Sequence, residues 1–149
     1  MDNHSKETRS YNMSRIRSTN TKPEEIVRKY LFSKGLRYRK NDKRYAGKPD
    51  IVLPRYKTVI FVNGCFWHGH EGCRYFVMPK SNLEYWNSKI SRNIERDIQN
   101  IEKLRSEDWK VIVVWECELK KDKKEETLLN LYKSIINEEK IPKGEHNIE

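Results

Sequence analysis

Apolar residues recur at steps of three and four in three stretches of the chain, which is the spacing of one helix face. The first stretch follows Thr21-Lys22-Pro23-Glu24, a capping box with proline in the first turn, and stops at Gly35. The second begins at another capping box, Ser81-Asn82-Leu83-Glu84, and continues to about residue 106, and the third covers about residues 124–138. The pattern therefore predicts three helices, each with one face against a core.

Short runs between these helices are typical of strands. Residues 36–39 alternate, residues 49–54 form a short apolar run, and residues 58–62 and 110–115 are continuous, as in strands buried on both faces. This order predicts an α/β domain with helices flanking a mixed sheet. A tight turn at residues 55–57 pairs the second and third runs as a hairpin, so Asp50 and Asn63 are expected at neighbouring strand ends.

Length and composition limit the organisation. A chain of 149 residues is long enough for one domain with a substantial core. We expect a single domain over residues 21–140, a flexible basic arm at residues 1–20 and a loose tail at residues 141–149. The sequence has no run of about eighteen apolar residues, no apolar N-terminal signal and no lipidation motif, so a soluble cytoplasmic protein is expected.

The chain is basic, with a formal net charge of +9 from 31 Lys and Arg against 22 Asp and Glu. An excess of this size favours a polyanionic partner, most simply DNA or RNA, and the alternative is a basic protein whose charge is only solvated. Arg9, Arg15 and Arg17 are spread through the N-terminal arm. We expect this arm to order on a phosphate backbone, unless it is simply a frayed terminus.

One short segment, from Val62 to Cys73, holds two cysteines, two histidines and three glycines. Thiolate and imidazole ligands at loop spacings suit zinc, which binds four such groups tetrahedrally. Cys65, His70 and Cys73 supply three ligands, and Cys117 is the one cysteine left for the fourth position. An odd number of cysteines does not suit a disulfide framework. The sequence therefore predicts a zinc site, provided that the 110–115 strand lies beside the 58–62 strand.

Acidic residues suggest a second metal site. Asp50 begins a strand beside the histidine-bearing loop, which makes it a candidate ligand for Mg²⁺. Glu24 and Glu25 lie in the first turn of the first predicted helix. From the sequence alone, the favoured interpretation is that these two glutamates only cap the helix and complement its dipole.

Several of these motifs together resemble the very short patch repair (Vsr) DNA mismatch endonucleases. The resemblance rests on Pro49-Asp50, Gly64-Cys65-Phe66-Trp67-His68, Trp115-Glu116-Cys117, Thr21-Lys22-Pro23-Glu24, Asn12-Met13 and Asn93-Ile94-Glu95-Arg96-Asp97, and spans about residues 8–120. It implies a restriction-endonuclease-like fold with a structural zinc. It also implies an enzyme that uses Mg²⁺ to nick one DNA strand on the 5′ side of the T in a T·G mismatch, usually where 5-methylcytosine has deaminated.

The resemblance also implies roles for individual residues. Asp50 matches the catalytic aspartate that binds Mg²⁺, and His68 matches the histidine that activates the attacking water. Glu24 matches a carboxylate that reaches the same site from the first helix, a role that one residue can combine with capping. The matching zinc ligands, which leave no open position for chemistry, are Cys65, His70, Cys73 and Cys117.

Val62-Asn63 stands where the best-known members of that family have Thr-His. The family's magnesium contact at the first position is made by the backbone carbonyl, which Val62 also supplies. Asn63 cannot titrate, but it can form a hydrogen bond with the phosphate or with a metal-bound water. One extra residue also separates His70 from Cys73 in this chain.

Phe66, Trp67 and Trp86 match aromatic residues that the family inserts between base pairs beside the mismatch. Unstacking costs about a few kcal/mol per step and is cheapest at a mismatch, so insertion itself discriminates. The alternative is that Phe66 and Trp67 are core residues. Met13 and Arg15 of the N-terminal arm are expected to clasp the opposite, minor-groove side.

Two other functions remain open at this point. One is a non-catalytic zinc-containing DNA-binding module, which would leave Asp50, Glu24 and His68 without a task. The other is a restriction-type nuclease that cuts both strands of paired DNA. Because a single nick needs one active site, a monomer is expected, and a functional link to a cytosine-5 methyltransferase is a further hypothesis.

Overall fold

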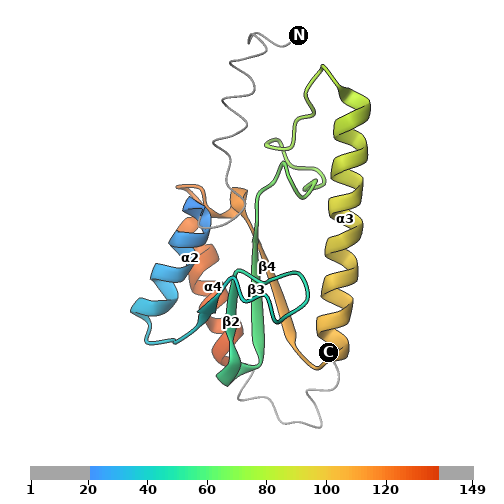
Figure 1. Ribbon diagram of the computed structural model, residues 1–149. Helices are drawn as coiled ribbons and strands as arrows, with labels where there is room; N and C mark the ends of the chain where they lie inside the picture. Colours follow the sequence, from blue (N-terminus) through green and yellow to red (C-terminus); the bar gives the residue numbers. More distant parts are fainter. Residues whose placement is uncertain (1–20, 138–149) are drawn as a thin grey trace.

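The computed structural model describes residues 21–137, which form a four-stranded mixed sheet between helices (Figure 1). The strands are β1 (Arg39–Lys40), β2 (Ile51–Leu53), β3 (Thr58–Asn63) and β4 (Lys110–Trp115), in that order across the sheet. The helices are α2 (Lys22–Ser33), α3 (Leu83–Ser106) and α4 (Lys124–Asn137), with short 3-10 turns η1 (Pro54–Tyr56) and η2 (Glu116–Leu119). The first three strands pair antiparallel, and β3 pairs parallel with β4, which confirms the predicted α/β mixed sheet.

The helices cover the two faces of the sheet separately: α2 and α4 lie on one side and α3 on the other (Figure 1). The alternation along β3 explains this division, because successive side chains point to opposite faces. Ile60 and Val62 belong to the larger core, with side chains from α2 and α4. Val59 and Phe61 pack with Leu104 of α3 in the smaller core.

The first helix begins as the sequence predicts. The Thr21 side chain accepts a hydrogen bond from the Glu24 backbone N–H at 3.4 Å, and Pro23 occupies the first turn. The helix ends before Gly35, whose φ of +87° is the left-handed conformation that glycine adopts without a Cβ clash. The Leu36 N–H then donates a hydrogen bond to the Leu31 carbonyl at 3.1 Å, so Leu36 belongs to the C-terminal cap of the helix and not to a strand. The predicted strand at residues 36–39 is wrong in position, and β1 contains Arg39 and Lys40.

The second predicted capping box is wrong. The cap of α3 is Asn82, in the left-handed conformation with φ of +57°, and no side-chain hydrogen bond caps the helix. The Trp86 N–H bonds to the Asn82 carbonyl, so the helix begins one residue later than a cap at Ser81 requires. The predicted length of the helix is confirmed.

The apolar stripe of α3 is covered only in part. Ile90 and Leu104 are buried, but Leu83, Ile94 and Ile98 are 47%, 37% and 52% exposed. Length explains the exposure of Leu83 at the N-terminal end, since 24 residues of helix span roughly 36 Å and a six-residue strand spans roughly 20 Å. The N-terminal half of α3 therefore extends past the sheet and runs beside the loop at residues 64–82 (Figure 1). Ile98 lies in the C-terminal half and is exposed because, one residue after Asp97, it is turned about 100° from the face that packs on the sheet.

Two predicted segments lie outside the part of the chain that the structure describes. The predicted arm at residues 1–20, with Met13 and Arg15, and the tail at residues 141–149 lie outside the described residues. Within residues 21–137, none of the helices has the length and hydrophobicity needed to cross a membrane.

The partial cover of α3 leads to a stability prediction. Replacement of Leu104 by Ala removes a fully buried side chain from the core between α3 and the sheet, and we expect the free energy of unfolding to fall by about 2–5 kcal/mol. Replacement of the half-exposed Ile98 on the same helix is the matched control and should change it by less than about 0.5 kcal/mol. Urea denaturation of both variants measures the difference, and equal losses would contradict the observed packing of α3.

Candidate active site and metal cluster

Asp50 lies immediately before β2, and its carboxylate turns toward the end of β3. Its Oδ2 accepts a hydrogen bond from the Val62 backbone N–H at 2.6 Å. This contact brings the start of β2 to the end of β3, as the predicted hairpin requires. Burial raises the pKa of Asp50 to about 7, and the negative charge and hydrogen bonding of Glu24 add to the effect of burial. The Val62 N–H and the nearby His68 act in the opposite direction.

His68 lies on the loop that follows β3 and is paired with α3. Its ring nitrogen Nδ1 is 2.6 Å from Oδ2 of Asp97, and both side chains are about one-third exposed. When Nδ1 donates its hydrogen to Asp97, the lone pair of Nε2 is left free to accept a proton. Asp97 belongs to the motif that carries the family resemblance, but the sequence alone predicts no role for it, because only the fold brings α3 against the loop.

The loop is held against α3 by two further contacts. The Asn93 side-chain amide donates to the Trp67 carbonyl at 2.9 Å. Gly69 has φ of +58°, and a Cβ there would lie 2.9 Å from Ile90 and 2.7 Å from Ile94. A glycine is therefore required at this position both by the backbone conformation and by the close approach of α3.

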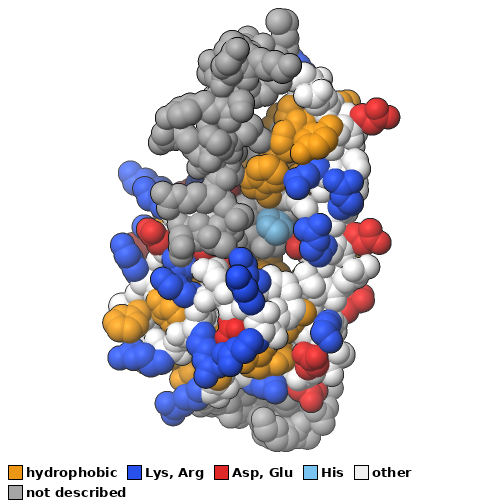
Figure 2. Space-filling model, viewed as in Figure 1, with side chains coloured by type: hydrophobic (Ala, Val, Ile, Leu, Met, Phe, Trp, Pro, Cys, Tyr) orange, Lys and Arg blue, Asp and Glu red, His pale blue; other side chains and the backbone are white. Residues whose placement is uncertain are grey.

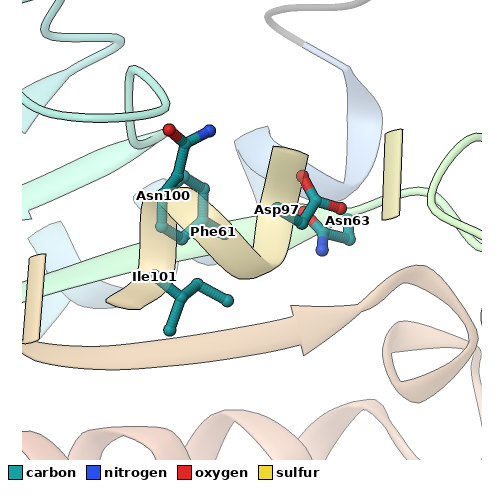
Figure 3. A pocket seen from close by; sticks show the side chains of 5 residues that line it. All are labelled: Phe61, Asn63, Asp97, Asn100 and Ile101. Carbon is teal, nitrogen blue, oxygen red and sulfur yellow. The ribbon is translucent and has the colours of Figure 1, made fainter. Parts of the chain in front are cut away.

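Asn63, the last residue of β3, lies beside Asp97. It is 6% exposed, and with Phe61 of β3 it lines a small pocket whose other wall is Asp97, Asn100 and Ile101 of α3 (Figure 3). The pocket has room for about one water molecule. Asn63 and Asp97 lie beside one another here, so Asn63 is close to the carboxylate that contacts His68.

Four predicted zinc ligands come together beyond the ends of β3 and β4. One ligand atom from each of Cys65, His70, Cys73 and Cys117 lies within 4.8 Å of the others. A tetrahedral zinc site with Zn–S bonds of about 2.3 Å places its ligands roughly 3.8 Å apart, so the group fits such an ion with small adjustments. Burial raises the pKa of the Cys65 thiol to about 12, and a bound cation favours its ionised form. The predicted position of Cys117 beside the loop is therefore confirmed.

Trp115 lies between the cluster and the His68 side chain. Its ring stacks on His70 with ring centroids 3.9 Å apart and planes 3° apart. The same ring contacts His68 edge to face, with centroids 6.5 Å apart. The Trp115 backbone N–H donates to Glu118 at 2.9 Å, which fixes the start of η2. One ring at the end of β4 thus supports both histidines.

The three aromatic residues expected to contact DNA form one half-buried group. Phe66 lies 5.3 Å from Trp67 and 5.4 Å from Trp86 between ring centroids, and Trp67 lies 5.7 Å from Trp86. Hydrophobic side chains gather beside the N-terminal end of α3, flanked by Lys and Arg and next to a histidine (Figure 2). These rings are therefore neither fully buried in the core nor fully exposed.

Comparisons with known proteins agree with this arrangement. The family model described as DNA mismatch endonuclease Vsr matches residues 1–74. The type II nicking enzyme V.NmeAIP of Neisseria meningitidis serogroup A is 61% identical over 112 residues, which are 75% of this chain and 79% of that protein. The type II nicking enzyme V.XorIIP of Xanthomonas oryzae pv. oryzae is 51% identical over 79% of this chain and 86% of its own. DNA mismatch endonuclease Vsr of Escherichia coli is 42% identical over 80% of this chain and 76% of its own.

The mixed sheet between helices is the restriction-endonuclease-like architecture of an endonuclease. The chain belongs to the Vsr family.

The burial of Asp50 leads to a prediction about pH. Its pKa is raised in the folded protein, so the folded state holds this proton more tightly than the unfolded state, and the free energy of unfolding falls as pH rises from about 4 to about 7. Asp50→Asn keeps an acceptor for Val62 and removes the titration. The free energy of unfolding of Asp50→Asn minus that of wild type should therefore increase by about 2 kcal/mol from about pH 5.5 to pH 8, because only wild type loses the stabilising proton.

Urea denaturation in Mg²⁺-free buffer at both pH values measures this change. Titration of the zinc cluster affects both proteins alike and cancels in the difference. A difference between Asp50→Asn and wild type that does not depend on pH would show that Asp50 is not a buried, proton-binding carboxyl.

Proposed function

We propose that this protein is a mismatch endonuclease that nicks one DNA strand on the 5′ side of the T in a T·G pair, in an Mg²⁺-dependent hydrolysis. The observation that carries the proposal is the convergence of Asp50, at the start of β2, with the His68–Asp97 pair on the loop and α3. The names of the relatives support an endonuclease that acts on mismatched DNA or nicks one strand. The base pair and the metal are inferred from the family resemblance and from the chemistry of these residues.

In this proposal His68 removes a proton from the attacking water. Asp97 accepts the Nδ1 hydrogen, holds the ring in one orientation and stabilises the positive charge that the imidazole gains. Asp50, the Val62 carbonyl and Glu24 would hold Mg²⁺, with Asn63 bonded to the phosphate or to a metal-bound water. When bound, Mg²⁺ polarises the phosphoryl oxygen and stabilises the leaving oxygen.

The cluster of Cys65, His70, Cys73 and Cys117 is proposed to hold Zn²⁺ as a structural ion. Four protein ligands leave no open position, so the ion has no chemical task. Its effect is to fix the loop that carries His68, Phe66 and Trp67. A stiff loop is what ring insertion requires, because a mobile one would fold away from the base stack.

Phe66, Trp67 and Trp86 are proposed to insert beside the mismatch. Here they make edge contacts with one another, so insertion exchanges ring–ring contacts for ring–base stacking. The basic arm with Met13 and Arg15 would contact the opposite groove. A monomer is sufficient for a single nick, and the deaminated base would link this activity to that of a cytosine-5 methyltransferase.

A nicking assay tests the proposal. Duplexes with one T·G pair and matched duplexes of otherwise identical sequence are incubated with and without Mg²⁺. We expect a single nick in the T-containing strand of the mismatched duplex alone, only with Mg²⁺, and a loss of about 10²–10⁴ in rate for His68→Ala. Equal cleavage of both duplexes, or cuts in both strands, would favour the restriction-type alternative. Binding without cleavage would favour the DNA-binding module.

A second prediction concerns the aromatic group. Phe66→Ala with Trp67→Ala removes two half-buried rings, and we expect the preference for mismatched over matched DNA to fall by about tenfold or more, since each stacked base contributes about 1–3 kcal/mol. Zinc content, measured by atomic absorption, should stay at the wild-type level. Replacement of the distant half-exposed Phe32 by Ala is the matched control. Loss of zinc in the double variant would mean that the rings are structural.

A further inference from the structure

Arg28 is a buried charge that the proposed chemistry does not use. It lies one turn after Glu24 on α2, and its Nη1 is 3.1 Å from Oε1 of Glu24. The two residues are 6% and 2% exposed. A buried ion pair is a poor source of stability, because the loss of hydration of both charges offsets most of their attraction. The arrangement therefore calls for another explanation.

Glu24 connects this pair to the candidate Mg²⁺ site. The Asp50 carboxyl forms a hydrogen bond with Glu24, and Asp50 also accepts from the Val62 N–H at 2.6 Å. A continuous chain of contacts thus runs from Arg28 through Glu24 to Asp50 and the end of β3. One end of this chain is on α2 and the other is on the sheet.

The geometry points to Arg28 as a positioning residue: its guanidinium holds the Glu24 carboxylate beside Asp50, so that two carboxylates face the Mg²⁺ site. This inference rests on the proposed function, in which Asp50 binds the metal. A glutamate side chain has three rotatable bonds, and an ion pair within the same helix restricts them. Residues that orient metal ligands from behind commonly change metal affinity by 10–100-fold when they are replaced.

The inference and simple electrostatics predict opposite results. Arg28 is positively charged, so its removal alone would strengthen the binding of a cation through reduced repulsion. If Arg28 acts by holding Glu24, its removal weakens cation binding, because Glu24 no longer presents a charged oxygen beside Asp50. A purely structural Arg28 would alter the melting temperature and leave cation affinity unchanged.

The experiment is titration of the zinc-loaded, full-length protein with Mn²⁺, followed by electron paramagnetic resonance of the free ion. We expect Arg28→Met to weaken Mn²⁺ binding by about tenfold or more and Arg28→Lys to restore part of the affinity. Lys103→Met is the matched control, because Lys103 forms an exposed ion pair of the same spacing with Glu107 at the C-terminal end of α3. This control should bind Mn²⁺ like wild type.

A double-mutant comparison keeps the test decisive if Arg28→Met does not fold. Glu24→Gln with Arg28→Met removes both charges and should bind Mn²⁺ no more weakly than Glu24→Gln alone, since Arg28 then has nothing to position and its charge only repels the cation. Tighter or unchanged binding by Arg28→Met, or weaker binding by the double variant than by Glu24→Gln alone, would overturn the inference. Asp50→Asn separates this failure from failure of the proposed function. If that variant binds Mn²⁺ with wild-type affinity, Asp50 is not a metal ligand and the proposed function itself fails.

Discussion

The parallel pairing of β3 with β4 is the constraint on which the site depends. Its register sets Asn63 opposite Trp115, at the point where both strands end. Cys65 and Cys117 each follow two residues later, so segments far apart in the chain deliver two thiols to one place. A register shift of one residue would turn alternate side chains to the opposite face and would separate both the thiols and the His70–Trp115 stack. The register between β3 and β4 therefore determines which side chains meet where the two strands end.

A cost in stability accompanies this arrangement. Asp50 is buried beside a second carboxylate, and burial favours its neutral form, as its raised pKa shows. A core with an apolar residue in this place would be more stable. Such conflicts are typical of sites that bind cations, because the charge that is unfavourable in the free protein becomes favourable when the cation is present. The Val62 N–H limits the conflict by favouring the ionised carboxylate.

Local signals predicted the elements that depend on local physics. The cap at Thr21, the two continuous strands and the helical spacing after residue 82 all reflect interactions within a few residues, and each element is confirmed. Burial on both faces is confirmed for β3 only, because β4 is at the edge of the sheet and is buried only at Val111 and Val114. The metal cluster was predictable because cysteine and histidine have few other reasons to gather in a loop. The second capping box failed because Ser81 and Glu84 match the motif, while the left-handed Asn82 moves the start of the helix by one residue.

The features of the site that could not be predicted from the sequence depend on tertiary contacts. Asp97 follows Ile90 by seven residues and precedes Ile101 by four, so it lies on the face of α3 turned to the sheet, whereas Glu95 and Glu102 are exposed. The spacing marks Asp97 as an acidic residue on an otherwise apolar face, but it does not identify the partner. Its partner His68 is known only once α3 is packed against the loop. Similarly, Leu83 and Ile90 follow the same spacing, but Leu83 is 47% exposed and Ile90 is buried beside Gly69, because the N-terminal end of α3 extends past the sheet. Spacing identifies a face of a helix but not how much of that face is covered.

The long helix also explains why the loop can be both rigid and exposed. Successive turns of α3 contact it: Ile90 and Ile94 lie against Gly69, Asn93 bonds to the Trp67 carbonyl, and Asp97 bonds to His68. The cysteine and histidine cluster holds the same loop from the sheet side. Contacts on two sides limit the movement of the loop, so the aromatic rings and His68 are expected to keep their relative positions. A displacement of Phe66 or Trp67 would therefore also move His68, which follows them directly in the chain.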